Sequence, residues 1–177
     1  GGDGRLPFRV VATVRDLRGQ LPTRGEYGRR TLADIEYIVI HHTAKEVDST
    51  AESIARYHVD GLGWSGIGYA WLVHQDGAID RCQDYVTVSY HVAGRNRECL
   101  GVCLTGDWSE REPPETQIEA ARWLVEHIRD AIGWRPILGH AEVALPGYDT
   151  DCPGGTWPQW QGRVDERTGK QWQPSKQ

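Results

Sequence analysis

The sequence predicts an α/β fold in which a single domain has a central mixed β-sheet flanked by helices. Segments rich in β-branched and aliphatic residues alternate along the chain with segments of helical periodicity, an order typical of α/β domains. Residues 37–42 and 100–105 carry apolar side chains at both odd and even positions, as strands covered on both faces do. A chain of 177 residues is long enough for one such domain.

The composition argues against two broad classes of partner. The formal net charge is -5 and the pI is about 5.8, so the chain lacks the excess of cations typical of nucleic-acid binders. No apolar run approaches the roughly 20 residues that cross a bilayer. We expect a monomer with neither a nucleic-acid partner nor a membrane span.

Composition also suggests how the chain is divided. Residues 1–31 are rich in glycine and arginine with little sustained periodicity, so we expect an irregular N-terminal arm laid over the domain. The folded unit is expected over residues 32–160. The polar residues 161–177 are expected to form a frayed C-terminal tail.

The first strand and helix follow from the pattern of residues 37–61. Successive side chains of a strand point to opposite faces, so the strand over 37–42 places His41 and His42 on opposite sides of the sheet. A capping box over residues 49–52 then begins a helix that ends near His58.

The second half of the chain predicts a hairpin, a long helix and a short strand. The Asp-Gly pair at residues 76–77 supplies the turn of a β-hairpin. A second capping box, over residues 116–119, starts a helix whose apolar residues repeat at spacings of three and four and which Gly133 ends. Residues 135–139 then form a short strand that delivers a histidine to the end of the sheet.

The four cysteines show no closely spaced pairs of the kind that hold structural zinc. A disulfide between Cys82 and Cys99 on neighbouring predicted strands is left open, so the cysteine count does not decide the redox compartment.

Three residues are candidate metal ligands. His41 stands at one strand end, His140 at another, and Cys152 in the loop that follows. Two imidazoles and one thiolate fit Zn²⁺, and a site with three protein ligands leaves a fourth position for water, as catalytic zinc sites do. The natural chemistry of such a site is hydrolysis of an amide or ester. The same residues also allow a thiol hydrolase, in which Cys152 is the nucleophile and His140 its base.

Five segments in this order carry a resemblance. They are Ile38-Val39-Ile40-His41-His42-Thr43-Ala44, Gly63-Trp64-Ser65-Gly66-Ile67-Gly68-Tyr69, Leu100-Gly101-Val102-Cys103-Leu104-Thr105-Gly106, Gly139-His140 and Asp151-Cys152-Pro153-Gly154. Over about residues 35–157 the chain resembles the zinc-dependent N-acetylmuramoyl-L-alanine amidases, a group that includes phage amidase-type lysozymes and animal peptidoglycan recognition proteins.

The resemblance implies roles for individual residues. His41, His140 and Cys152 match the three zinc ligands of the family. Tyr69 matches the tyrosine that positions the attacking water or stabilises the tetrahedral intermediate. Thr150 stands where phage lysozymes have lysine and many animal amidases have threonine, so the second electrostatic stabiliser is weaker or differently placed.

The resemblance also implies which residues bind the substrate. The loop that carries His91, Arg95 and Asn96 resembles one that edges the family's cleft, and His91 is a candidate, with Tyr69, for the proton donor to the leaving amine. Trp64 resembles the tryptophan of a Gly-Trp pair that favours diaminopimelate stems in recognition proteins. The stem type itself is left open, because the arginine that accompanies the pair has no clean match.

The implied activity is hydrolysis of the amide bond between N-acetylmuramic acid and L-alanine in peptidoglycan. The resemblance implies that a zinc-bound water attacks the lactyl carbonyl and that the stem peptide leaves as an amine. Such a protein acts on the bacterial cell wall, either secreted or periplasmic or phage-encoded and released at lysis, although no export signal is visible in this chain. The alternative is a non-catalytic peptidoglycan-binding recognition module of the same fold.

Overall fold

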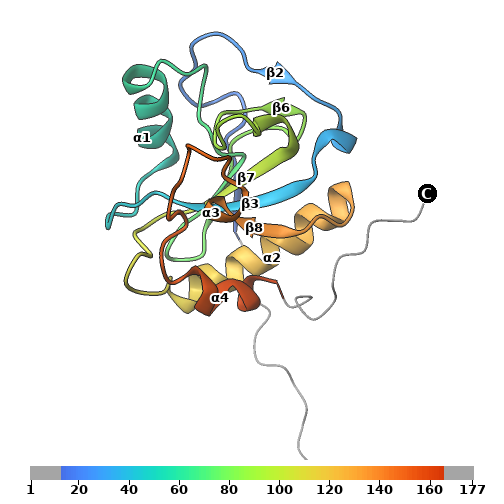
Figure 1. Cartoon of the computed structure of the whole chain (residues 1–177). Helices are drawn as coiled ribbons and strands as arrows, with labels where there is room; N and C mark the ends of the chain where they lie inside the picture. The colour runs from blue at the N-terminus through green and yellow to red at the C-terminus, as the bar shows by residue number, and fades with distance from the viewer. Residues whose placement is uncertain (1–12, 166–177) are drawn as a thin grey trace, which may run out of the picture.

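The computed structural model describes residues 13–165, which form a six-stranded sheet with helices on both faces (Figure 1). The strands lie in the order β1-β5-β4-β7-β3-β8. Their bounds are Val14–Asp16 for β1, Tyr37–His42 for β3, Trp71–Val73 for β4, Ile79–Arg81 for β5, Cys99–Leu104 for β7 and Ile137–Gly139 for β8. Strands β4, β7, β3 and β8 run parallel, β5 is antiparallel to β4, and β1 is parallel to β5. The mixed sheet confirms the predicted fold class.

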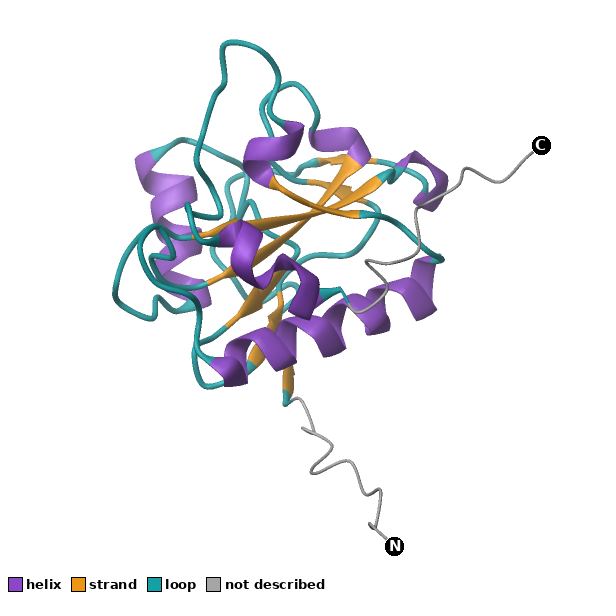
Figure 2. Cartoon of the chain, turned by 60° about the horizontal axis from the view of Figure 1, so that its bottom comes forward, coloured by secondary structure: helices purple, strands orange, loops and turns teal. Residues whose placement is uncertain are grey.

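Helices cover both faces of this sheet. Helices α2 (Glu115–Ile132) and α4 (Trp157–Val164) lie side by side on one face, and the long α2 runs across the bottom of the domain in Figure 2. Helices α1 (Ala51–Arg56) and α3 (His140–Val143) pack on the opposite face. A separate two-stranded sheet and three short helical turns complete the described chain: β2 Gly28–Arg29 with β6 Thr87–Val88, η1 Leu32–Asp34, η2 Tyr57–Gly61 and η3 Asn96–Glu98.

Strand β3 is covered on both faces, as its apolar pattern predicts. Ile38 and Ile40 belong to the core beneath α2 and α4, whereas Val39 packs with Val143 of α3 on the other face. All three β3 residues are completely buried. The alternation of side chains along this strand is therefore confirmed.

The two helices predicted from capping boxes form, but neither begins where its box predicts. Helix α1 begins after Thr50, whose hydroxyl accepts a hydrogen bond from the backbone of Ser53 at 3.1 Å, and η2 extends the helical segment to Gly61. Helix α2 begins directly after Pro114, and Thr116 instead donates its hydroxyl to the Gln75 carbonyl. Pro114, two residues before Thr116, therefore occupies the N-cap position, and no side chain caps this helix start.

The predicted irregular arm contains ordered structure. Strand β1 extends the sheet at its edge, β2 pairs with β6, and Leu17 lies in the core next to α1. Arg30, which falls in the same segment, is buried and bonded to backbone carbonyls. The expectation of an irregular arm is wrong for these residues, because short strands at a sheet edge need backbone partners rather than a hydrophobic period. Residues 1–12 lie outside the described chain.

The expected frayed tail is also wrong for its first residues. Helix α4 continues to Val164, which is completely buried, and Asp165 pairs with Arg129 of α2. The helix was not predicted, because its apolar residues Trp157, Trp160 and Val164 are too few to establish a period. The rest of the predicted tail, residues 166–177, lies outside the described chain.

Two further sequence questions are answered for the described residues. All four cysteines of the chain are buried free thiols, so Cys82 and Cys99 are not bridged. Between residues 13 and 165 no helix is long and apolar enough to cross a membrane.

The ion pair between Arg129 and Asp165 is expected to hold α4 against α2. The two side chains are bonded at 2.9 and 3.1 Å, and the Arg129 side chain is only 2% exposed. Asp165→Ala removes the carboxylate bonded to this guanidinium and leaves only the half-exposed Glu126 at 3.7 Å, so we expect a loss of roughly 3 kcal/mol in the free energy of unfolding, measured with urea. The control is Glu112→Ala, which removes an exposed partner of Arg163 and should cost less than about 1 kcal/mol. Equal small losses for the two variants would contradict the assignment.

Candidate metal centre

The carboxyl ends of β3 and β8 bring two histidines together. These strands are parallel neighbours in which Ile40 is paired with Gly139, so the next residues, His41 and His140, emerge at the same level. Their ring centroids are 4.6 Å apart. His140 directly follows β8 and is the first residue of α3.

Cys152 reaches the same point from the loop after α3. Its carbonyl accepts a hydrogen bond from the Ala141 backbone at 2.7 Å, and its Sγ accepts one from the His42 backbone at 3.4 Å. A side chain at Gly139 would lie 2.8 Å from the Trp157 indole nitrogen and 2.9 Å from Pro153, so glycine lets this loop approach the strand.

The three predicted ligands therefore form one cluster. Donor atoms of His41, His140 and Cys152 all lie within 4.8 Å of one another, and His41 Nδ1 is 3.7 Å from the Cys152 sulfur. This is the single group of three or more potential metal ligands found among residues 13–165, and its atoms could hold a metal ion. His42 faces the opposite side of β3, where its Nδ1 accepts a hydrogen bond from the Trp108 backbone at 3.2 Å.

Burial keeps the cluster uncharged before any ion binds. It lowers the pKa of His41 well below the ordinary value, and it also lowers the pKa of His140. Burial raises the pKa of the Cys152 thiol to about 12. Neutral imidazoles present free lone pairs, and a bound cation would displace the thiol proton.

Tyr69 lies between this cluster and a small pocket. Its ring centroid is 5.2 Å from that of His41, and burial raises the pKa of its hydroxyl well above the ordinary value, so the hydroxyl stays protonated. The pocket has a volume of about 160 Å³ and is lined by Thr43, Lys45, Ser49, Ser53, Ile54, Tyr57, His58 and Tyr69.

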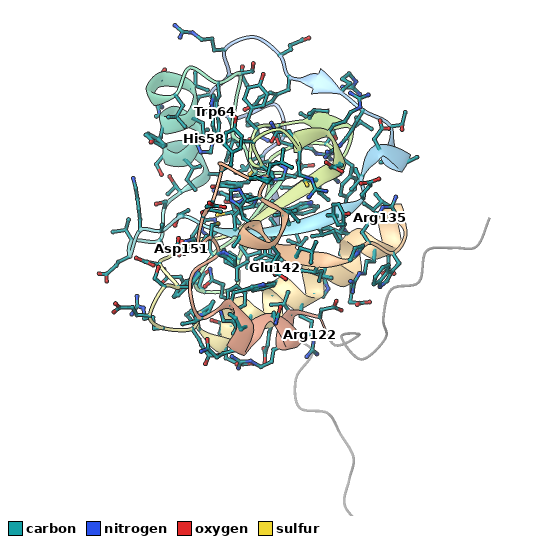
Figure 3. The ribbon with its side chains drawn as sticks, viewed as in Figure 1. His58, Trp64, Arg122, Arg135, Glu142 and Asp151 are labelled. Atoms are coloured by element: carbon teal, nitrogen blue, oxygen red, sulfur yellow. The ribbon has the colours of Figure 1, made fainter. Side chains whose placement is uncertain are left out.

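His58 is a residue of this pocket that the sequence interpretation passed over. Figure 3 shows it next to Trp64, with ring centroids 4.6 Å apart, and its Nδ1 accepts a hydrogen bond from the Gly68 backbone at 2.9 Å. Burial lowers its pKa to about 4, so it is neutral at physiological pH. The available signal was its position four residues after Ile54, on the buried side of the helix.

Trp64 packs against His58 of the pocket, and Thr150 contacts Cys152 of the cluster. Trp64 is half-buried, and its ring also meets that of Tyr90 edge-on at 5.8 Å. The Thr150 hydroxyl accepts a hydrogen bond from the Cys152 backbone at 3.1 Å and so holds the loop that carries the thiol.

The loop predicted to contact substrate packs against His41 through His91. His91 has both ring nitrogens engaged, one 2.9 Å from His41 Nε2 and the other 2.9 Å from the Cys99 carbonyl. Asn96 Oδ1 accepts hydrogen bonds from the His91 and Val92 backbones at 2.9 and 2.8 Å.

Arg95 holds the same loop through two hydrogen bonds. It binds Glu98 at 2.8 Å and the Val143 carbonyl at 3.1 Å. Through these contacts all three residues hold the loop, and the predicted contact of His91, Arg95 and Asn96 with substrate stays a prediction.

Arg30 holds the other side of this loop and was not predicted. Its guanidinium is buried and donates to the carbonyls of Tyr85, Asn96, Arg97 and Cys99, at distances of 2.8 to 3.1 Å. No sequence signal separates this arginine from its exposed neighbours, since only the tertiary fold surrounds it with carbonyl groups.

A second polar network anchors the loop that leads from β3 to α1. His74 lies between two carboxylates, with Nδ1 2.8 Å from Asp48 and Nε2 2.7 Å from Asp80. Thr105 donates its hydroxyl to Asp48 at 2.7 Å. Burial alone would lower the pKa of His74, but its hydrogen bonds and attraction to the two carboxylates outweigh burial and raise the pKa to about 9.

This network predicts a dependence of stability on pH. The folded-state pKa of His74 lies above the ordinary value of 6.5, so its stabilisation is complete below about pH 6.5 and is lost as the pH rises through 9. We expect the free energy of unfolding to fall by up to about 3 kcal/mol over this range in the wild type. His74→Gln should be less stable at pH 6 and should show a flatter profile. Parallel profiles in urea unfolding would contradict the assignment.

The fold and the site together define an α/β protein with a cluster of metal-ligand side chains at the carboxyl edge of its sheet. A family model described as N-acetylmuramoyl-L-alanine amidase matches residues 31–155, and the chain belongs to this family. The resemblance seen in the sequence is thereby confirmed.

Relatives of the chain carry two kinds of name. It is 30% identical over 158 residues to peptidoglycan-recognition protein SC2 of Drosophila melanogaster, an alignment that covers 77% of this chain and 82% of the relative. It is also 30% identical to N-acetylmuramoyl-L-alanine amidase of Sus scrofa, covering 86% of this chain and 28% of that longer protein.

Solved structures share the fold. N-acetylmuramoyl-L-alanine amidase LysC from Clostridium intestinale superposes with a TM-score of 0.73 at 22% identity, covering 88% of this chain and 97% of that one. Drosophila PGRP-LB superposes with a TM-score of 0.65 at 27% identity, covering 81% and 89%.

Proposed function

We propose that this protein is a zinc-dependent hydrolase that cleaves the amide bond between N-acetylmuramic acid and L-alanine in peptidoglycan. The observation that carries the proposal is the cluster of His41, His140 and Cys152, with all donor atoms within 4.8 Å and Tyr69 beside it. Family membership supplies the substrate class, because relatives are named both as amidases of this bond and as peptidoglycan-recognition proteins.

The donor set fits zinc. Two neutral imidazole nitrogens and a thiolate are ligands that zinc prefers, and three protein ligands leave one position open. When bound, zinc would supply a Lewis acid and a water activated near neutral pH. The raised thiol pKa of Cys152 does not oppose this, since a cation replaces the proton. It does argue against a free thiolate nucleophile, which needs a lowered pKa.

Two hydroxyls stand beside the cluster for the acyl chemistry. Tyr69 stays protonated and can donate a hydrogen bond to the oxygen on which charge develops as the amide carbonyl is attacked. The Thr150 hydroxyl, which accepts from the Cys152 backbone, retains its own proton to donate to the same region. We propose these two residues as the stabilisers of that charge.

The pocket beside Tyr69 is the proposed site for the substrate next to the scissile bond. His58 and Lys45 are among the residues that line it, and the half-buried Trp64 packs against His58. An aromatic ring with polar neighbours suits a sugar or peptide that presents both apolar and hydrogen-bonding surfaces. The proposed place of action is the bacterial cell wall, the location of this substrate.

The first test is the Cys152→Ser variant. Wild type is expected to hold about one zinc per chain and to release new amino termini from purified peptidoglycan, and the variant is expected to lose both. The matched control is Cys82→Ser, since Cys82 is also a buried free thiol but lies outside the cluster. This control should keep both zinc and activity.

Other outcomes of this experiment would overturn parts of the proposal. Cleavage by a wild type that carries no metal would rule out the zinc mechanism. A wild type that holds zinc and binds peptidoglycan without releasing amine would be a recognition module, which the names of several relatives make the main competitor.

Tyr69→Phe separates catalysis from metal binding. Removing one hydrogen-bond donor to a developing oxyanion costs about 10²-fold in kcat in comparable sites, and we expect a loss of that order here. The zinc content should stay unchanged, because the hydroxyl is not a ligand. An unchanged kcat would exclude Tyr69 from the reaction, and a loss of zinc would show that it supports the ligands instead.

A further inference from the structure

His91 lies in a space that only glycine leaves open. The residue sits between β6 and β7, and its ring lies against Gly101 in the middle of β7. A Cβ at position 101 would be 2.9 Å from His91 Nδ1 and 3.1 Å from its Cγ. Real Cβ atoms essentially never come within 3.0 Å of other atoms, so the ring and a larger residue could not both be accommodated.

The acceptor at one end of the His91 ring determines which ring nitrogen donates and which accepts. The Cys99 carbonyl can only accept, so His91 Nε2, 2.9 Å away, must carry the proton. A neutral imidazole has one N–H, which leaves His91 Nδ1 as an acceptor. His41 Nε2, 2.9 Å from that atom, must then donate.

This series of hydrogen bonds, from Cys99 through His91 to His41, ends at the metal-ligand cluster. Since the one proton of neutral His41 is on Nε2, its Nδ1 carries a free lone pair, and this is the atom that lies 3.7 Å from the Cys152 sulfur.

We propose that His91 is a positioning residue, which holds His41 in the tautomer and orientation that present Nδ1 to the metal. The proposal rests on the metal site of the proposed function, and it assigns His91 no contact with substrate. Partners of this kind behind a ligand typically contribute 10- to 100-fold to metal affinity.

The surroundings of His91 are built to keep it in place. Asn96 holds the His91 backbone through its side-chain oxygen, and Arg95 ties the loop to α3. Arg30 donates to the Cys99 carbonyl at 2.9 Å, the same group that accepts from His91. The buried Arg30 guanidinium therefore also fixes the Cys99 carbonyl, which is the acceptor for His91.

Two substitutions of His91 distinguish the effect of its hydrogen-bond acceptor from the effect of its size. In His91→Asn the side-chain Oδ1 is attached to Cγ, as Nδ1 is in histidine, so it can still accept from His41. His91→Leu has similar bulk and no acceptor. The Cys99 carbonyl keeps its bond from Arg30 in both variants, so neither leaves it unsatisfied.

The main measurement is the zinc dissociation constant, obtained by competition with a chelating dye. We expect His91→Leu to bind zinc 10- to 100-fold more weakly than wild type, and His91→Asn to stay within about threefold of wild type. Thermal unfolding of the zinc-free proteins shows whether both variants are folded. Equal affinity in wild type and a folded His91→Leu would overturn the proposal, as would equal weakening in both variants.

A spectroscopic measurement tests the tautomer directly. In ¹⁵N NMR spectra of the zinc-free wild type, His41 should be protonated on Nε2 and bare on Nδ1, and His91→Leu should lose this preference. A proton on His41 Nδ1 in the wild type would overturn the proposal.

These readouts distinguish failure of the inference from failure of the proposed function. A wild type with the expected tautomer that neither holds zinc nor cleaves peptidoglycan would refute the function and leave the hydrogen-bond chain standing. A wild type that holds zinc and cleaves while His91→Leu binds zinc equally well would refute only the role of His91.

Discussion

The parallel pairing of β3 with β8 is the constraint on which the site depends. Because Ile40 is opposite Gly139, the next residue of each segment is a histidine at the same level, His41 in β3 and His140 directly after β8. A shift of one residue in this register would send one imidazole to the other face of the sheet. The apolar residues of β3 on both faces hold the register by burial, so the core that stabilises the fold also aligns the candidate ligands.

Buried polar groups hold two of the loops around the candidate metal centre. Arg30 is surrounded by backbone carbonyls, and His74 by two carboxylates, so neither leaves a charge without partners. Each joins segments distant in sequence: Arg30 ties the segment before β3 to the loop after β6, and His74 ties the loop after β3 to β5. Two loops that border the candidate metal centre are thus held by polar contacts that the apolar core does not supply.

These contacts divide the surroundings of His41 into two sides. On one side are Tyr69 and the pocket that it lines together with His58. On the other side is His91, whose two ring nitrogens are both engaged within the protein. The family resemblance gave no way to separate these roles, because it assigned residues by their place in a motif. The partners of each side chain in the tertiary structure distinguish the two sides.

The sequence by itself determined the α/β class, the doubly covered β3, the hairpin at residues 76–77, the amphipathic α2 and the three members of the ligand cluster. These depend on local periodicity, turn chemistry and motifs, which can be read along the chain. The tertiary structure alone decided the rest: the edge strand β1, helix α4, buried Arg30, and the position of His91 behind His41. Each of these is set by partners far away in sequence, and a pattern within one segment contains no information on which carbonyl, strand or ring will face it.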